Sequence, residues 1–254
     1  MPAKPTVIGM IPARSGSKRI KDKNVRRLGG HPVLGYAIAA AQASGVFDSI
    51  LVSTDSEQYA AMARHYGAEV PFLRPAELAT ATSPDFEWID DTLTRLRGAG
   101  QRYDCFSILR PSSPLRQADT IRRAWAAFCG ETGVDSLRAV EKCRQHPGKM
   151  WVLRDNRMLP LMPLTIGPQP WHSMQYASLP EVYVQNASLE IAWCRVVFEQ
   201  RTIAGTTVMP FITEGLEGFD LNDPEDWWHL EHLLSTGEAK LPAIAAAPFR
   251  GAAE

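Results

Sequence analysis

Several features of common protein classes are missing from this chain of 254 residues. Its four cysteines, Cys105, Cys129, Cys143 and Cys194, include no C-x-x-C pair, so we expect reduced thiols rather than a zinc site or a disulfide framework. No signal peptide and no apolar run of transmembrane length is present. The net charge of −1 gives no overall field that favours nucleic acid or an anionic membrane. We therefore expect a soluble cytoplasmic protein with neither kind of partner.

The sequence also lacks the two most familiar nucleotide-binding motifs. There is no G-x-x-x-x-G-K-[ST] loop, and no G-x-G-x-x-G follows the first apolar run. The missing dinucleotide spacing argues against NAD. The motifs H-E-x-x-H and G-x-S-x-G are absent too, which disfavours a metalloprotease and a serine hydrolase.

The most informative stretch that is present follows an apolar run ending at Pro12. Its small residues would let backbone N–H groups approach an anion closely; they are Ala13, Ser15, Gly16 and Ser17. Its basic residues can supply charge to a polyphosphate; they are Arg14, Lys18 and Lys23. The alternative is a basic loop that only faces water.

Strand-like and helix-like segments alternate along the chain. The expected strands are Thr6–Ile11, Ser49–Thr54, Glu69–Phe72, Cys105–Leu109, Ser136–Val140, Val182–Val184, Ser188–Trp193 and Thr206–Met209. The expected helices are Val33–Ala43, Glu57–Tyr66, Phe86–Leu96, Gln117–Cys129 and Pro224–Leu234. This alternation predicts one α/β domain over residues 1–254, with a mostly parallel sheet, helices on both faces, and ligands at the carboxyl ends of the strands.

Four motifs closely resemble those of the sugar-activating cytidylyltransferases. They are I-P-A-R-x-G-S-K-R-I-x-x-K-N at residues 11–24, L-R-P-A-E-L-A at 73–79, L-R-P-S-S-P-L-R at 109–116 and F-D-L-N-D-P-E-D at 219–226. This family includes the acylneuraminate (sialic acid) cytidylyltransferases and relatives acting on bacterial nonulosonic acids or 3-deoxy-manno-octulosonate. The resemblance implies that CTP and a 2-keto sugar acid give a CMP-sugar and pyrophosphate, with Mg²⁺ or Mn²⁺. The alternatives are another sugar or NTP, or a non-catalytic nucleotide-binding domain.

The resemblance also implies a nucleotide-diphospho-sugar transferase-like fold with an inserted dimerisation element. Residues 142–182 are rich in proline and carry several Trp and Met residues, a composition that suits a subunit interface. We expect this segment to form a homodimer and to contribute to sugar binding. A lid or an irregular cap is the alternative.

The family motifs imply roles for the residues of the nucleotide site. Arg14 and Lys18 would hold the triphosphate, Lys23 would contact the α-phosphate or the leaving group, and Asn24 would lie beside the nucleotide. The segment around Arg74, Thr82 and Ser83 lies near the cytosine base in the family. Ser83-Pro84-Asp85 could instead cap the following helix.

The metal site is expected at Asp220 and Asn222, which would face the same side of a strand because they are two residues apart. The resembling sialic acid enzymes have Asp-x-Asp here, so this chain carries one charge less, although an amide oxygen also suits Mg²⁺. Asp223 is the other candidate ligand. We expect Asp223 to cap the last helix, with Asp226 completing a capping box.

The acceptor site is expected at Arg110, Lys149 and Asn186. Many sialic acid enzymes have Gln where Arg110 stands, and Arg110 could bind a carboxylate, reach a phosphate, or form a structural salt bridge. Lys149 belongs to an H-P-x-K match at residues 146–149, and Asn186 matches an Asn of the family's substrate segment.

Overall fold

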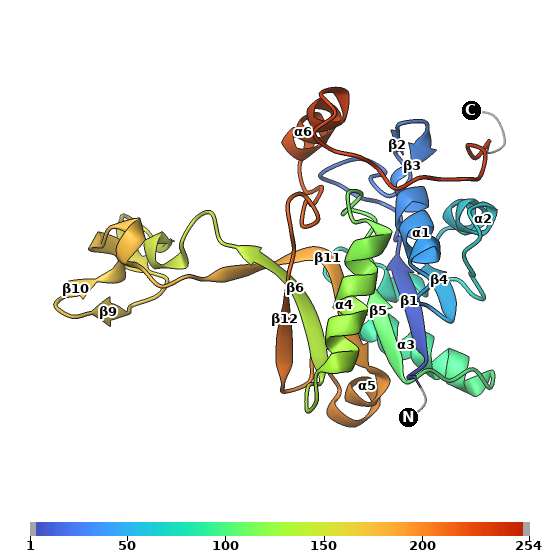
Figure 1. Ribbon diagram of the computed structural model, residues 1–254, viewed down its shortest axis with the longest axis horizontal. Coiled ribbons are helices and arrows are strands. Elements are labelled where there is room, and N and C mark those ends of the chain that lie inside the picture. Colours follow the sequence, from blue (N-terminus) through green and yellow to red (C-terminus); the bar gives the residue numbers. More distant parts are fainter. Residues whose placement is uncertain (1–3, 251–254) are drawn as a thin grey trace. The chain divides into compact units, whose positions relative to one another are not determined.

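The computed structural model describes residues 4–250 and divides the chain into two compact units (Figure 1). One unit, here called the body, comprises residues 4–139 and 186–250. The other, here called the insert, comprises residues 140–185. Two long strands cross the boundary: β6 (Ser136–Lys142) enters the insert and β11 (Tyr183–Trp193) returns from it.

The body is built on a mixed six-stranded sheet with the order β12-β6-β11-β5-β1-β4. Its remaining strands are β1 (Val7–Pro12), β4 (Ser49–Ser53), β5 (Cys105–Ile108) and β12 (Val208–Ile212). Strand β1 is parallel to β4 and to β5, whereas β11 is antiparallel to β5. The expected parallel sheet is therefore present at β5-β1-β4, and the returning strand β11 makes the whole sheet mixed.

Helices cover both faces of this sheet. They are α1 (Val33–Ser44), α2 (Glu57–His65), α3 (Asp85–Gly98), α4 (Ala118–Gly130) and α5 (Cys194–Gln200), while α6 (Pro224–Ser235) packs in a separate cluster. Alternate residues of β1 join different cores: Val7 and Ile11 pack with α1, α2 and α4, whereas Ile8 and Met10 pack with α3 and α5. A strand buried on both faces must be apolar throughout, which explains its uninterrupted apolar sequence.

Some boundaries and elements differ from the sequence prediction. The strand expected at Glu69–Phe72 is wrong, because only Glu69 makes a bridge, to Leu51, and Pro71 has no N–H to continue a ladder. The two strands expected at residues 182–184 and 188–193 form the single strand β11. Helix α5 was missed because seven residues are too few to show a helical period.

The predicted N-cap of the last helix is confirmed, and two other helices begin or end at residues typical of caps. Ser56 is the N-cap of α2 and accepts from the N–H of Tyr59. Gly45 ends α1 in the left-handed conformation. Asp223 is the N-cap of α6 in a capping box with Asp226.

Short elements complete the body. They are β2 (Arg27–Leu28), β3 (His31–Pro32) and a 3₁₀ turn, η1 (Ala76–Leu78). A third apolar cluster, which includes Ile20, Leu115, Leu221 and Trp227, packs α6 and the segment before it against the loop that follows β1. Among residues 4–250, no helix has both the length and the apolar character needed to cross a bilayer.

The insert consists of short hairpins and turns. Strands β7 (Trp151–Arg154) and β8 (Arg157–Pro160) pair antiparallel, as do β9 (Thr165–Ile166) and β10 (Gln169–Pro170). Three 3₁₀ turns accompany them: η2 (Pro147–Lys149), η3 (Trp171–Ser173) and η4 (Tyr176–Ser178). The Nζ of Lys149 donates to the carbonyl oxygens of His172 and Met174, which ties η2 to η3 and the residue that follows it.

Candidate active site

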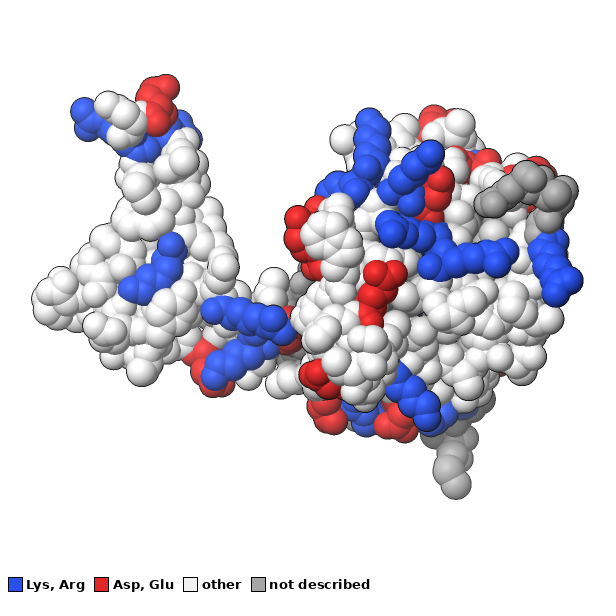
Figure 2. All heavy atoms as spheres, turned by 90° about the horizontal axis from the view of Figure 1, so that it is seen from above, with Lys and Arg blue, Asp and Glu red and all other residues white. Residues whose placement is uncertain are grey.

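A cavity of about 380 Å³ lies in the body at the carboxyl ends of β1 and β5. This is the edge at which open α/β sheets bind their ligands. Six basic and two acidic side chains line it, so its formal charge is strongly positive. They are Arg14, Lys18, Arg19, Lys23, Arg74 and Arg110, with Asp85 and Asp220. Figure 2 shows Lys and Arg side chains gathered on the body in the view from above.

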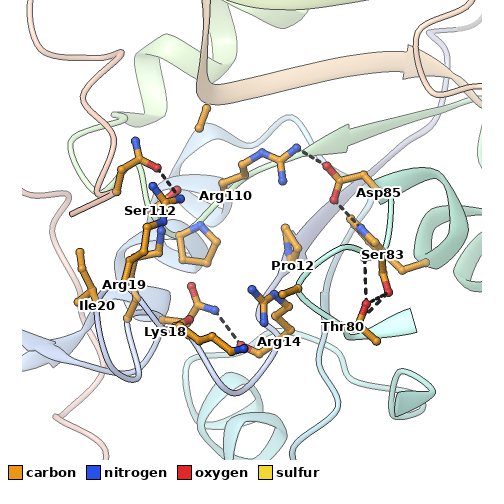
Figure 3. A pocket seen from close by; sticks show the side chains of 18 of the residues that line it. Pro12, Arg14, Lys18, Arg19, Ile20, Thr80, Ser83, Asp85, Arg110 and Ser112 are labelled. Atoms are coloured by element: carbon orange, nitrogen blue, oxygen red, sulfur yellow. Dashed lines mark hydrogen bonds and ion pairs between the residues drawn. The ribbon is translucent and has the colours of Figure 1, made fainter. Parts of the chain in front are cut away.

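The loop after β1 supplies one wall of this cavity. Arg14, Ser17, Lys18, Lys23 and Asn24 all line it, as the sequence indicated. Asn24 donates from Nδ2 to the carbonyl oxygen of Arg14 at 3.1 Å, which ties the two ends of the loop together. Figure 3 shows Arg14, Lys18 and Arg19 among the side chains around the pocket.

Four small residues of this loop were expected to approach an anion, and two of them are engaged elsewhere. Ser15 donates from its backbone N–H and from Oγ to Asp55, at 2.7 and 2.6 Å. Ala13 is fully buried and donates its N–H to the carbonyl oxygen of Ser53. Gly16 has a φ of 70°, which favours glycine, but like Ala13 and Ser15 it does not line the cavity. Ser17 is the one of the four that does.

Helix α2 and the residue before its N-cap hold this loop in place through two hydrogen-bonded contacts. Asp55, just before the helix, binds Ser15, and the hydroxyl of Tyr59 donates to Asp22 at 3.3 Å. Burial opposes the charge of Asp55, but its hydrogen bonds with Ser15 outweigh burial and lower its pKa. The loop is therefore held at two points by α2 and its cap region, a contact that the linear sequence did not reveal.

Lys23 lines the cavity and makes a hydrogen bond to the segment before α6. Its Nζ donates to the carbonyl oxygen of Leu221 at 2.6 Å. Burial lowers the pKa of Lys23, Asp220 opposes this effect, and Arg19, Arg14 and Arg110 lower the pKa further. Lys23 therefore lies in the field of both the loop cations and Asp220.

Asp220 and Asn222 share one side of the chain, as their spacing predicted, although the segment is not a strand. Leu221 between them is fully buried, and its N–H donates to the carbonyl oxygen of Ser112 at 2.8 Å. Asn222 donates from Nδ2 to Oδ2 of Asp220 at 2.8 Å. Burying Leu221 on one side turns the two polar residues to the other.

This pair fits a hard divalent cation. Oδ1 of Asp220 is buried and has no hydrogen-bond partner, so one carboxylate oxygen is available as a ligand. Mg²⁺ takes few protein oxygens and keeps water or phosphate in its other positions. Residues 4–250 contain no cluster of three His, Cys, Asp or Glu that could hold a metal without such additional ligands. Asp223 serves as the cap of α6.

The opposite wall comes from the segment after β4 and the start of α3. Arg74 is buried and donates to Ser53 through Nε and Nη2, both at 3.0 Å, while its guanidinium lies 4.6 Å from the ring centre of Trp88. Burial lowers the pKa of Arg74 to about 10. Ser83 lines the cavity together with Thr80, and their hydroxyls are 2.7 Å apart, whereas Thr82 does not line it.

The expected capping of α3 by Ser83 or Asp85 is wrong. The N-cap is Pro84, which makes no side-chain hydrogen bond, and Asp85 is the first helical residue. Ser83 donates from Oγ to the carbonyl oxygen of Glu77 instead. Both side chains line the cavity, where Ser83 binds Glu77 and Asp85 accepts from Trp88 and Arg110.

Arg110 lines the cavity and is bound by two acids. Its Nη2 lies 2.6 Å from Oδ2 of Asp85 and 2.9 Å from Oε1 of Glu190 (Figure 3 shows the first of these contacts). Glu190 also pairs with Arg138, and both side chains are largely buried. Burial would raise the pKa of Asp85, but Arg110, Trp88 and Arg74 outweigh it and lower the pKa. Glu190 was not expected from the sequence, although a charge within an apolar strand was a usable signal.

The two other expected acceptor residues are not among those that line this cavity. Asn186 donates from Nδ2 to Oγ1 of Thr213 at 2.9 Å and accepts from the N–H of Ser188. Lys149 belongs to the insert, where its Nζ binds the two carbonyl oxygens described above.

Comparison with known proteins identifies the family. Residues 8–84 match the family model described as Cytidylyltransferase. The chain is 32% identical over 237 residues to the CMP-N,N'-diacetyllegionaminic acid synthase of Legionella pneumophila, which covers 92% of this chain and 99% of that protein. The chain belongs to the nonulosonic acid CMP-sugar synthetase family. It is therefore a nucleotidyltransferase.

Two further comparisons agree with this assignment. The synthetase is 44% identical over 118 residues to the N-acylneuraminate cytidylyltransferase of Escherichia coli, spanning 46% of this chain and 27% of that longer protein. Its fold matches a structure of CMP:2-keto-3-deoxy-manno-octonic acid synthetase complexed with CTP, with a TM-score of 0.67 and 12% identity, over 91% of this chain and 99% of that chain. The second likeness supports the fold, including the mixed sheet with helices on both faces.

Proposed function

We propose that this enzyme transfers the CMP group of CTP to a nonulosonic acid, a sialic acid-like 2-keto sugar acid, and releases pyrophosphate. The oxygen of the anomeric hydroxyl bonds to the α-phosphorus, the bond from that phosphorus to the β-phosphate oxygen breaks, and the hydroxyl loses its proton. The observation that carries this proposal is that one cavity combines the loop cations, Lys23 and Asp220.

The cations divide into two roles. Arg14 and Lys18 bind the β- and γ-phosphates, with Ser17 and Asn24 beside them. Lys23 neutralises charge at the α-phosphate and on the departing pyrophosphate, because it lies between the loop and Asp220. The carbonyl oxygen of Leu221 holds its ammonium group in place before substrate arrives, which is the preorganisation that charge stabilisation requires.

The cytosine side of CTP is assigned to the wall formed by Arg74 and Ser83. Arg74 is fixed by its hydrogen bond to Ser53 and by its contact with the ring of Trp88. Its guanidinium is therefore held in one position beside the cavity rather than mobile. The chain's match to a cytidylyltransferase model through residue 84, and its relatives' names, favour CTP over other NTPs.

Asp220 and Asn222 would hold Mg²⁺, or Mn²⁺, through one carboxylate oxygen and one amide oxygen. When bound, such an ion neutralises phosphate charge and orients the phosphate oxygens. The orphaned, buried Oδ1 of Asp220 supports this assignment.

The insert supports a homodimer. Its exposed large apolar side chains include Leu153, Met158, Leu161 and Tyr176, each more than half exposed. Strand β7 is exposed along its whole length, and a two-stranded hairpin without a packed face is marginally stable in water. Apolar surface of this extent is typical of protein–protein contacts. A second copy of the insert would cover it and could contribute residues to sugar binding.

We place the reaction in the cytoplasm. All four cysteines are free, although two of them, Cys129 and Cys143, are not buried, and a reducing compartment keeps such thiols free. Both substrates are small anions, which suits the positive cavity and requires neither nucleic acid nor membrane.

The test is pyrophosphate release by the purified enzyme with CTP, UTP, GTP or ATP, each with a panel of sugar acids. The panel contains legionaminic, pseudaminic and sialic acids and 3-deoxy-manno-octulosonate. We expect release only with CTP and fastest with a nonulosonic acid. Faster turnover with another NTP, or with the octulosonate, would overturn the corresponding half of the proposal.

A further inference from the structure

The buried ion cluster around Arg110 has a geometry that a simple surface salt bridge lacks. Glu190 lies on β11 and its side chain is 5% exposed, while Arg138 lies on β6 and is 12% exposed. Arg110 and Asp85 are 26% and 31% exposed, and both line the cavity. The cluster therefore runs from the interior of the sheet to the pocket surface, and Arg110 is its outermost cation.

The two acids use only part of the Arg110 guanidinium. Both contacts are made by Nη2, whose two N–H bonds serve Asp85 and Glu190. A guanidinium carries five N–H donors, so Nη1 and Nε retain three. Arg110 is thus anchored at one nitrogen and keeps N–H donors on the other two, each of which can donate to an oxygen of a carboxylate.

The position of Arg110 matters for the reaction. In a 2-keto sugar acid the carboxylate carbon is bonded directly to the anomeric carbon whose hydroxyl attacks phosphorus. A group that binds the carboxylate must therefore lie close to the reacting phosphate. Arg110 shares the cavity with Lys23 and is near enough to act on the pKa of its ammonium group.

The charges around Arg110 also distinguish it from the phosphate-binding cations. Two Arg and two carboxylates make the cluster neutral overall. Within residues 4–250, no buried acid forms an ion pair with Arg14, Lys18 or Arg19 of the loop, and these cations suit a highly charged triphosphate. A neutral cluster whose outermost cation keeps N–H donors suits a single negative charge.

We propose that Arg110 binds the carboxylate of the acceptor sugar acid and that Glu190, with Asp85, is the positioning residue that holds Arg110 for this task. The proposal rests on the proposed function and adds the residues that select the acceptor. Arg138 pairs with the second carboxylate oxygen of Glu190, so a second cation lies beside the buried acid that contacts Arg110.

The test compares Glu190→Gln with wild type in steady-state kinetics, using the sugar acid that the wild type turns over fastest. Gln keeps the shape and an acceptor oxygen but loses the charge. We expect the KM for the sugar acid to rise about tenfold or more, with the KM for CTP within about twofold, because one charge-assisted hydrogen bond that orients Arg110 is weakened. Glu190→Asp should recover part of the loss.

The matched control is Asp135→Asn, at a buried acid of the body that pairs with Arg195 at 2.6 Å and does not line the cavity. It should lower the melting temperature and leave both KM values unchanged. If Glu190→Gln behaves like this control, the cluster is only structural and the proposal is wrong. A rise in the KM for CTP instead would make Arg110 a phosphate ligand and would also overturn it.

A second measurement uses the methyl ester of the same sugar acid as an inhibitor, which keeps the proposal testable if Glu190→Gln folds poorly. Arg110→Lys should weaken binding of the free acid about tenfold but weaken that of the ester far less, because the ester offers no anion. Equal losses for acid and ester would contradict carboxylate recognition. If the wild type turns over no sugar acid at all, the proposed function itself fails, and this inference fails with it.

Discussion

The body and the insert place their polar and apolar side chains in opposite ways. In the body, hydrogen bonds and ion pairs fix the charged side chains that line the cavity. Lys23 binds the carbonyl oxygen of Leu221, Arg74 binds Ser53, and Arg110 binds Asp85 and Glu190. In the insert, Lys149 turns its charge inward to carbonyl oxygens, while Leu153 and its apolar neighbours face outward.

The difference indicates whether each region buries its own apolar side chains. The body buries its own apolar residues in three clusters, and all the residues that line the positively charged cavity belong to it. The insert has no comparable buried cluster among the described residues, and its outward apolar surface suits contact with another subunit. Substitutions in the body should therefore alter chemistry, and those in the insert should alter assembly or stability.

The largest expected effect is that of Lys23→Ala in the body. If Lys23 stabilises charge that grows in the transition state, kcat should fall about a hundredfold or more, and the affinity for CTP should fall less. The matched control is Lys21→Ala, an exposed cation of the same loop that does not line this cavity. Steady-state pyrophosphate release measures both. Near-normal kcat in Lys23→Ala would show that this cation has no catalytic role.

The second prediction concerns the metal-binding pair. Asp220→Asn removes the one protein carboxylate assigned to Mg²⁺, so activity should fall steeply even at high magnesium. Asn222→Asp adds a carboxylate, and the variant should stay active while needing less magnesium, because a hard cation binds better as ligand charge rises.

Asp223→Ala separates this arrangement from the alternative. Asp223 caps α6, so its loss should lower stability by about 1 kcal/mol and leave the magnesium requirement unchanged. Magnesium titrations of the three variants are the measurement. Wild-type activity and magnesium dependence in Asp220→Asn would refute the assignment, and a raised requirement in Asp223→Ala would move the second ligand there.

The third prediction tests the insert. Leu153 is 71% exposed, and Leu153→Glu should weaken the homodimer by about tenfold or more, because a charge cannot be buried cheaply at an apolar contact. Light scattering across a micromolar concentration series measures the shift. Trp228→Glu is the control, since Trp228 is 64% exposed on α6 in the body. A fully active wild-type monomer at these concentrations would remove the proposed role of the insert.

The smallest effect is expected from Lys149→Met, which keeps the length of the side chain. Its two hydrogen bonds to carbonyl oxygens are lost, and stability should fall by roughly 1 kcal/mol for this partly exposed group, with little change in either KM. Urea unfolding followed by tryptophan fluorescence measures the loss. An unchanged unfolding curve with a raised KM for the sugar acid would return Lys149 to its expected role in substrate binding.

The sequence by itself determined the local parts of this protein. The apolar run before Pro12 and the alternation of segments predicted the α/β body, which is confirmed. Arg14, Lys18 and Lys23 of the basic loop line one cavity, and Asp220 and Asn222 lie on one side of their segment. Such placements follow from neighbours within a few residues, where backbone geometry is nearly fixed; that the cavity binds an anion stays a prediction.

Tertiary structure alone decided which polar groups are already engaged. Ser15 was expected to face a nucleotide, but Asp55, 40 residues away, binds its N–H and hydroxyl. The ion-pair partners of Arg110 were not predicted, because Asp85 and Glu190 are 25 and 80 residues away from it in the sequence. No local pattern encodes such pairs: they form only when the sheet order brings β5 beside β11 and α3 onto the same face. Buried polar groups must then be satisfied by whichever partners the packing supplies.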